Sequence, residues 1–423
     1  MKSLTAEERD TARLNVIKEE TWLKYFKELW SNEEKIEENN SEDTYNHTVD
    51  PITMKELENA LTSLKNRKAG GPDGISAELI NYGGPIFKIK FLHFINQCWY
   101  KTKIPDEWLE AIIVPIFKKE DRNKCSNYRG ISLLNVSYKV YTKIINCRIA
   151  KISGHILLEE QQGFRKGRST IDDIFCLKQI MEKRIEFNRE THLAFIDLEK
   201  ASDRISRQKL WGILRNRGYP EHLIQTVKSL YEGTKIMIKG NQMKEEINQG
   251  VRQGCSLSPI LFNIYMDDMI REWKKMVPSG IYLGNHVYLN LLLYADDQVI
   301  IQENEDDLQR SIYKLNQLCK EYNFHISLQK TKIMAFKGSV PIRSKIVLDD
   351  QVLEQISHFN YLGCDVTYLD NHEITNRVHK FQVICGCVNK TLNKGIILKS
   401  RSISRNLQRM WKYRDTDNLM PSV

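Results

Sequence analysis

Apolar residues recur at intervals of three and four over much of the chain, a spacing that places them on one face of an α-helix. In residues 4–38 this face comprises Trp22, Tyr25, Phe26, Leu29 and Trp30. The polar stretch Glu33–His47 that follows predicts a loop or linker. The same spacing predicts further helices at residues 53–66, 77–103, 137–153, 169–189, 207–232 and 306–323. Thr53, followed by Glu56, has the pattern of a capping box.

Short apolar runs bounded by turn residues predict β-strands between these helices. They lie at Ala111–Phe117, at Thr191–Leu198 and in two arms of Leu289–Ile301, with shorter strands in residues 345–368. Thr234–Lys239 and Glu245–Gln249 predict a hairpin with Gly240 and Asn241 at its turn. Because helices and strands alternate irregularly, the pattern predicts an α+β fold rather than a doubly wound parallel sheet.

The composition allows a folded core and points to a polyanionic partner. Of the 423 residues, 41% are hydrophobic and 28% are charged, which excludes disorder throughout the chain. Residues 1–60 carry 8 basic and 15 acidic side chains, so this part has a net charge of −7 and the rest carries +16. A basic body of this size favours nucleic acid as a partner, although basic surfaces also serve solubility alone.

The cysteine pattern and the hydropathy argue against a zinc-binding, a secreted or a membrane-spanning protein. The nine cysteines include no CxxC pair and no Cys/His set with zinc spacing. The N-terminus is charged from its first residues and has no apolar leader segment. The longest apolar runs fall far short of the roughly 20 residues that a membrane span needs. We therefore expect an intracellular protein without a membrane partner, and the sequence does not decide between nucleus and cytoplasm.

Adjacent carboxylates occupy the centre of Leu289–Ile301. Two apolar arms flank Tyr294-Ala-Asp-Asp297, which predicts a hairpin with Asp296 and Asp297 at its tip. Two like charges at one turn repel each other, and a divalent cation would remove that cost. The alternative is that an Asp pair in a turn is ordinary turn chemistry.

A third carboxylate lies in a similar setting, because the apolar strand from Thr191 ends at Asp197. Three carboxylates at neighbouring strand ends would suit two Mg²⁺ ions, with Mn²⁺ as the alternative ion, in nucleotidyl transfer. Glu199 and Asp203, which follow Asp197, are expected to be solvated or helix-capping acids rather than ligands.

These segments resemble the reverse transcriptases of non-LTR (LINE-type) retrotransposons. Phe195–Ala201 and Tyr294–Asp297 resemble the polymerase motifs A and C of that family. Six more blocks follow the family order from about residue 55 to 390. They are Lys68–Ser76 before the fingers, Asn127–Leu134 and Gln161–Thr170 in the fingers, Gly250–Asn263 as motif B, and Ile326–Lys332 and Phe359–Gly363 as motifs D and E.

The resemblance implies a right-hand polymerase with fingers, a palm built on an antiparallel sheet, and a partial helical thumb. The implied divisions are an acidic helical extension and linker at 1–50, fingers at 55–190, palm at 191–368, and a truncated thumb with a basic tail at 369–423. It implies RNA-directed DNA synthesis, in which dNTPs are added to a DNA primer on an RNA template. An RNA-templated RNA polymerase or an intron maturase would share the palm but fits the block before the fingers less well.

The resemblance also implies roles for single residues. Asp197, Asp296 and Asp297 would hold the two metal ions. Arg129 and Arg165 would reach the triphosphate of the incoming nucleotide, since guanidinium groups bind phosphate oxygens in pairs. Further implied contacts are Gln253 and Gly254 with the nucleotide and template, Tyr294 near the primer end, and Lys330 as a general acid for pyrophosphate.

The chain departs from the family pattern at two places. Relatives usually have an aromatic residue where this chain has Ser202, and that ring excludes the 2′-hydroxyl of a ribonucleotide. We therefore expect weaker discrimination against ribonucleotides or reduced activity. The helical pattern at Thr375–Asn393 resembles the start of a thumb, but the residues after it do not continue that resemblance. The alternative function is therefore a weakened retroelement remnant that binds nucleic acid without productive polymerisation.

Overall fold

The computed structural model describes residues 17–31, 49–118, 120–240, 243–284 and 287–369. They belong to two compact units, Met1–Ile356 and Ser357–Val423. No helix in the described ranges is both long enough and apolar enough to cross a membrane. The helix expected at Thr375–Asn393 lies outside the described residues.

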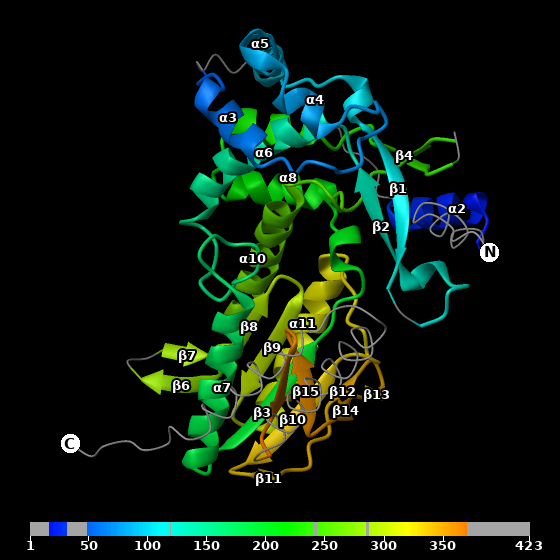
Figure 1. The fold of residues 1–423 in the computed structure, drawn as a ribbon. Coiled ribbons are helices and arrows are strands. Elements are labelled where there is room, and N and C mark those ends of the chain that lie inside the picture. Colours follow the sequence, from blue (N-terminus) through cyan, green and yellow to red (C-terminus); the bar gives the residue numbers. More distant parts are fainter. Residues whose placement is uncertain (1–16, 32–48, 119, 241–242, 285–286, 370–423) are drawn as a thin grey trace, which may run out of the picture. The chain divides into compact units, whose positions relative to one another are not determined.

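One end of the first unit is built from helices around a small sheet (Figure 1). The helices are α2 (Glu19–Leu29), α3 (Met54–Thr62), α4 (Ala77–Asn81), α5 (Gly84–Lys101) and α6 (Val136–Ser153). The expected capping box of α3 is confirmed, because Thr53 and Glu56 bond reciprocally to each other's backbone N–H groups.

The small sheet has the strand order β2-β1-β4-β5. Its strands are β1 (Glu110–Phe117), β2 (Tyr128–Leu133), β4 (Lys235–Ile238) and β5 (Glu245–Glu246). β1 pairs antiparallel with β2 and parallel with β4, and β4 pairs antiparallel with β5. The expected hairpin of β4 and β5 is therefore present, with a shorter second strand than the sequence predicts.

A second sheet forms the other end of this unit, with the order β11-β10-β3-β9-β8 and β14 beside β10. Its strands are β3 (Glu190–Ile196), β8 (Leu291–Tyr294), β9 (Asp297–Gln302), β10 (Lys332–Lys337), β11 (Val340–Pro341) and β14 (Glu354–Gln355). The three central strands are buried along nearly their whole length. Their almost continuous apolar sequences follow from burial on both faces of the sheet.

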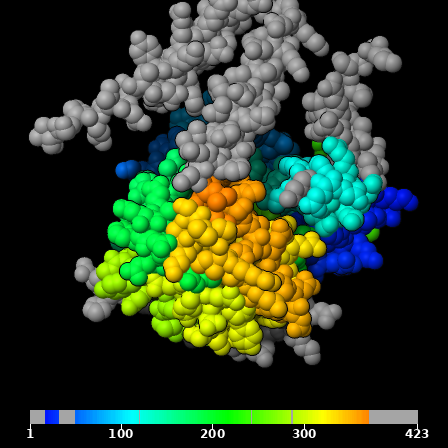
Figure 2. Space-filling model, turned by 90° about the horizontal axis from the view of Figure 1, so that it is seen from below, coloured from blue at the N-terminus to red at the C-terminus, as the bar shows by residue number. Residues whose placement is uncertain are grey.

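Helices cover this sheet and join it to the rest of the unit. They are α7 (Thr170–Glu186), α8 (Arg207–Asn216), α9 (Glu221–Ser229), α10 (Ser258–Met276) and α11 (Glu305–Glu321). α10 packs against α6, α8 and α11. Seen from below, α7 forms the green surface, while α11 and the segments that follow it form the yellow to orange surface (Figure 2).

The remaining strands form small pairs. They are β6 (Ile281–Gly284) with β7 (Val287–Leu289), β12 (Val347–Leu348) with β13 (Gln351–Val352), and β15 (His358–Tyr361) with β16 (Cys364–Thr367) in the second unit. The hairpin β15–β16 turns through Leu362 and Gly363, both with positive φ. The short strands expected in residues 345–368 are thus confirmed.

Three expectations about elements need correction. The helix expected at 77–103 is two helices, α4 and α5, and the helix expected at 207–232 is α8 and α9, divided near Gly218 and Pro220. α10 was not predicted at all, although it is the longest described helix. It is buried on most of its faces, and a helix that is apolar nearly all round lacks the periodic signal of an amphipathic helix.

Candidate active site

The second sheet brings the three predicted carboxylates to one edge. β3 and β9 pair antiparallel with Ile196 opposite Gln298, so Asp197 comes opposite Asp297 where the two strands end. Tyr294 pairs with Asp297 across the β8–β9 hairpin. Directly opposite residues in an antiparallel pair have Cβ atoms about 4.5–5.5 Å apart. The register of β3 and β9 therefore places Asp197 beside the Asp296–Asp297 pair, although the pair lies a hundred residues later in the sequence.

The turn that carries Asp296 and Asp297 is held by hydrogen bonds with Gln161 and Gln162. Ala295 has a φ of +58°, a left-handed conformation that costs energy for a residue with a Cβ. Its N–H donates to Oε1 of Gln161 at 2.9 Å. The N–H of Gln162 donates to the carbonyl of Leu293 at 2.8 Å. The strained turn is thus fixed by bonds from a distant part of the chain.

Gly163 allows this close approach. A Cβ at this position would lie 2.4 Å from the backbone nitrogen of Ala295, which leaves no space for any other residue. The Gly163 N–H also donates to Oε1 of Gln161, and Nδ2 of Asn263 on α10 donates to the Gly163 carbonyl. Residues 161–163 therefore form a brace between α10 and the carboxylate turn.

The carboxylates at the turn have raised pKa values. Solvent reaches the edges of both side chains, but packed protein atoms remove much of their hydration. Burial, followed by repulsion from Asp296 and Asp197, raises the pKa of Asp297 to about 6. Burial also raises the pKa of Asp296, and Asp197 adds to the rise. Asp197 thus makes both acids of the turn harder to ionise, and Asp296 adds to the effect on Asp297, as expected of like charges at close range.

Basic side chains surround the turn without neutralising it. Nζ of Lys330, the predicted general acid, lies 3.4 Å from Oδ2 of Asp197. Lys118, just after β1, and Arg129, on β2, both oppose the rise in the pKa of Asp296. Within the described ranges, no three acidic, histidine or cysteine side chains converge as a ready-made metal cluster. The donor chemistry nevertheless fits hard cations, because carboxylate oxygens bind Mg²⁺ and bound positive charge relieves the repulsion.

The segments that carry the predicted nucleotide residues Ser202, Gln253 and Gly254 contact one another. The carbonyl of Ser202 accepts from the N–H of Val251, which joins motif A to motif B. Nε2 of Gln253 donates to Oδ1 of Asp203 at 3.1 Å. Gly254 has a φ of +119°, and a Cβ there would lie 2.7 Å from the carbonyl oxygen of Ser132. The close approach expected of Gly254 is therefore to strand β2.

Two of these positions differ from expectation. Asp203 is neither solvated nor a helix cap. It is 7% exposed and accepts hydrogen bonds from Trp30 as well as Gln253. Arg165 does not extend freely into the site, because its Nη1 donates to the carbonyls of Leu158 and Gln161 at 2.7 and 3.2 Å. A buried guanidinium meets its hydrogen-bonding needs locally, so Arg165 would have to leave these carbonyls to reach a triphosphate.

Several residues of the site were missed from the sequence. Gln161 was part of a recognised block, but nothing in its neighbourhood indicated that its side chain reaches Ala295. Lys118 ends an apolar strand, and a basic residue there is a weak signal. Trp30 appeared only as a member of an amphipathic face, whereas its indole N–H donates to a carboxylate 173 positions away. Long-range pairs of this kind leave no periodic trace in the sequence.

The sheet carries three acids at the ends of neighbouring strands, with a lysine 3.4 Å from one of them, and this set of donors suits divalent cations. The family model described as reverse transcriptase (RNA-dependent DNA polymerase) matches residues 116–366. The chain belongs to this family, and its α+β architecture agrees with the right-hand polymerase fold that was predicted.

Curated relatives come from retrotransposons. The chain is 26% identical over 268 residues to a transposon TX1 uncharacterized 149 kDa protein of Xenopus laevis, covering 62% of this chain and 20% of that one. It is 26% identical over 330 residues to a probable RNA-directed DNA polymerase from transposon BS of Drosophila melanogaster, covering 74% and 36%. The RNA-directed DNA polymerase from mobile element jockey of Drosophila funebris is 23% identical over 348 residues, covering 79% and 37%. The predicted non-LTR affinity is confirmed.

The chain spans between about a fifth and two fifths of the length of these relatives. Among solved structures, an apo telomerase from Candida tropicalis, truncated from its C-terminal domain, matches 67% of this chain and 59% of its own. Its TM-score is 0.46 and its sequence identity 15%.

Proposed function

We propose that this chain is an RNA-directed DNA polymerase domain that adds dNTPs to the 3′-hydroxyl of a DNA primer on an RNA template. The observation that carries the proposal is the strand register that places Asp197, Asp296 and Asp297 at the same end of the sheet. Two of these acids have pKa values raised partly by the others. Such a group of acids is unfavourable by itself and becomes favourable once cations bind.

Asp197, Asp296 and Asp297 would hold two divalent cations, Mg²⁺ or Mn²⁺. When bound, such ions activate the primer hydroxyl and stabilise the charge on the reacting phosphate. Lys330 would give its proton to the departing pyrophosphate, and its 3.4 Å distance from Asp197 keeps it at the reacting centre. Arg129 and Lys118 both act to lower the pKa of Asp296, and positive charge at this distance would favour the approach of a triphosphate.

Ser202 bears on the choice of sugar. It stands between Lys200 and Asp203 in motif A, and it is smaller than the aromatic residue usual in the family. We propose that this position leaves space for a 2′-hydroxyl, so that ribonucleotides are rejected less strongly than in relatives.

The location in the cell is proposed as intracellular, where the template and nucleotides are found.

The test is primer extension by the full chain on an RNA template with Mg²⁺, with dNTPs and rNTPs offered separately. The control carries Asp296→Ala and Asp297→Ala, and binding of template–primer is measured for both proteins. DNA synthesis that the control loses while it still binds would establish the proposal. Binding without extension by the unaltered chain would contradict it and identify a nucleic-acid-binding remnant. Equal rejection of ribonucleotides by the chain and by Ser202→Phe would contradict the role of Ser202.

A further inference from the structure

The N-terminal helix α2 lies outside residues 116–366, to which the reverse transcriptase family model applies. It is nevertheless bound firmly to motif B. Trp22, Phe26 and Trp30 stack along its inner face, with ring centroids 5.8 and 4.7 Å apart. The carbonyl of Trp30 accepts hydrogen bonds from the N–H groups of Asn248 and Gln249 at 3.1 and 2.9 Å. The end of α2 is therefore attached to the strand that leads into Gln253.

Trp30 also reaches motif A through its side chain. Its indole N–H donates to Oδ1 of Asp203 at 2.9 Å, and Trp30 is itself 6% exposed. The same oxygen accepts from Nε2 of Gln253 at 3.1 Å. Two donors from two distant parts of the chain thus meet on one buried oxygen of Asp203. Burial raises the pKa of this carboxyl, and the bonds from Trp30 and Gln253 oppose the rise.

A second contact lies on the other side of Ser202. Nζ of Lys200 bonds to the hydroxyl of Tyr25 on α2 and lies 4.6 Å from the centre of its ring. Tyr25 and Trp30 therefore contact Lys200 and Asp203, which lie on either side of Ser202 in the sequence. The short motif A segment, which has to present its backbone and side chains to a nucleotide sugar, is fixed at both ends by aromatic residues of one helix.

The contact with Asp203 also sets the orientation of Gln253. A glutamine amide has a donating end and an accepting end, and only its NH₂ can bond to a carboxylate. Asp203 therefore turns the NH₂ of Gln253 towards itself, so that the carbonyl oxygen points away from Asp203. Trp30 holds the Asp203 oxygen in the place where this orientation is favoured.

We propose that α2 completes the nucleotide pocket and that Trp30 is a positioning residue for nucleotide binding, acting through Asp203 on Gln253. The inference rests on the proposed polymerase function of the site. The ligand class is a nucleoside triphosphate, and the part of the ligand concerned is the sugar next to Ser202 and Gln253. Removal of the Trp30 N–H should weaken nucleotide binding while leaving the carboxylate turn intact.

The chain offers a matched control on the same helix. Trp22 is also buried, but its Nε1 has no hydrogen-bond partner within the described residues. Trp30→Phe removes the donor to Asp203, whereas Trp22→Phe removes an equivalent ring nitrogen that bonds to nothing there. We expect Trp30→Phe to raise the KM for dNTP by about tenfold, the size of one such bond, with kcat changed less than about twofold. Trp22→Phe should leave both constants unchanged.

A double-mutant cycle with Gln253→Ala tests the route of the effect. If Trp30 acts through Gln253, Trp30→Phe should add little to the KM of Gln253→Ala. Additive effects would overturn the route. A fall in kcat and melting temperature in both Trp30→Phe and Trp22→Phe, with KM unchanged, would mean that α2 serves stability alone.

Failure of the polymerase proposal would be recognised separately. If the unaltered chain extends no primer, the affinity of its template–primer complex for dNTP is measured directly, for the chain and for both tryptophan variants. Weaker binding by Trp30→Phe alone would support the inference without catalysis. Equal affinities, or no dNTP binding by any of the proteins, would overturn it.

Discussion

The fold treats two of the chain's five adjacent aspartate pairs in opposite ways. Asp267 and Asp268 lie on α10, and Asp296 and Asp297 lie at the β8–β9 turn. As sequence, each is a pair of acids beside apolar residues. The two pairs differ in the hydrogen-bond donors around their carboxylate oxygens. The α10 pair stabilises the fold, whereas the turn pair keeps oxygens that could bind a ligand.

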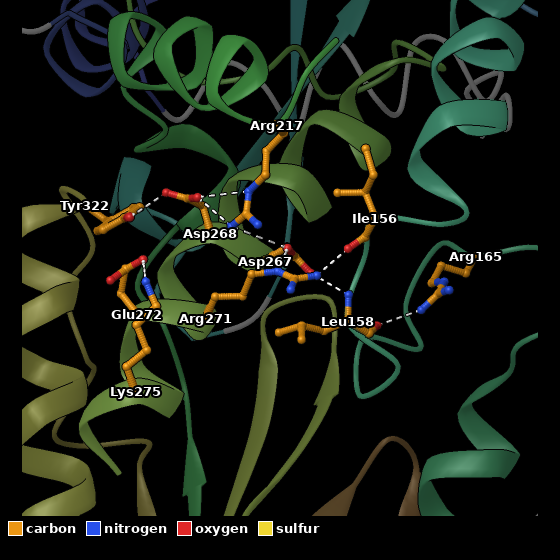
Figure 3. Close-up of polar contacts among 10 residues, drawn as sticks. All are labelled: Ile156, Leu158, Arg165, Arg217, Asp267, Asp268, Arg271, Glu272, Lys275 and Tyr322. Carbon is orange, nitrogen blue, oxygen red and sulfur yellow. Dashed lines mark hydrogen bonds and ion pairs between the residues drawn. The ribbon is translucent and has the colours of Figure 1, made fainter. Parts of the chain in front are cut away.

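All four carboxylate oxygens of the α10 pair have donors (Figure 3). Oδ1 of Asp267 accepts from the N–H of Leu158 at 2.6 Å, and its Oδ2 accepts from Nε of Arg271 at 2.7 Å. Asp268 accepts from Arg217 and from the hydroxyl of Tyr322, both at 2.7 Å. A cavity of about 720 Å³ opens beside them, lined in part by Arg217, Arg271 and Tyr322. Because donors already occupy the acids that line it, this cavity is not equipped to bind cations.

The turn pair lacks such donors. In the described part of the chain, neither Asp296 nor Asp297 accepts a hydrogen bond from another side chain, and both have raised pKa values. An acid pair without compensation is retained at a cost to stability, and such pairs cluster at functional sites. Whether its carboxylate oxygens already have hydrogen-bond donors, rather than the Asp-Asp motif itself, therefore distinguishes a candidate binding pair from a pair that stabilises the fold.

The largest expected effect is the loss of activity when the turn pair is changed. Asp297→Asn should lower kcat/KM for primer extension by on the order of 10³-fold or more, since a metal ligand is lost. Its melting temperature should stay equal or rise, because the substitution removes repulsion from Asp296 and Asp197. Primer extension and thermal unfolding are measured on the same preparation. A large fall in melting temperature would break the comparison.

The α10 pair should behave in the reverse manner. Asp267→Ala leaves the Leu158 N–H and the Arg271 guanidinium without their acceptor, so the free energy of unfolding should fall by about 3 kcal/mol. Urea unfolding measures this loss, with exposed Asp306→Ala on α11 as the control that should change little. The activity of the folded fraction should fall far less than in Asp297→Asn. A stable but inactive variant would show that the α10 pair is part of the site.

The pH dependence of stability and of Mg²⁺ affinity should also distinguish the turn pair from the α10 pair. With the folded pKa of Asp297 raised to about 6, its carboxylate destabilises the fold as pH rises from the unfolded pKa of about 4 towards 6. Below about pH 6, the apparent Mg²⁺ affinity should fall by up to about tenfold per pH unit, because bound ions require the ionised acid. Thermal shift with and without Mg²⁺ from pH 5 to 8 measures both effects. Asp297→Asn should reduce the dependence and leave only the part that comes from Asp296, and an unchanged slope in that variant would assign the dependence to another group.

A smaller effect is expected at the brace under the turn. Gln161→Leu keeps the approximate size of the side chain but removes the acceptor for the N–H groups of Ala295 and Gly163. The left-handed Ala295 would then lose a bond that holds it, and kcat should fall by about tenfold through misplacement of Asp296 and Asp297. Gln162→Leu, a change at the neighbouring residue that keeps its backbone bond to Leu293, is the control. Equal kcat values in both variants would show that the strands alone position the turn.

The sequence by itself determined much of the palm. The apolar runs with Asp197 at one strand end and Asp296–Asp297 at a hairpin tip predicted the strands β3, β8 and β9 but not the central strand β10, and the order of the blocks predicted the family. These features are local, because alternating burial and turn chemistry act within a few residues. The short capping box of α3 was predictable for the same reason.

Only the tertiary structure decided which polar groups meet. It joined Gln161 to Ala295 and Trp30 to Asp203, turned Arg165 towards its own loop, and gave donors to one aspartate pair but not to the other. These contacts link residues up to 173 positions apart, and no short-range pattern records such a separation. The physical reason is that a buried polar atom must find a partner wherever packing places one, so its partner is a property of the folded chain.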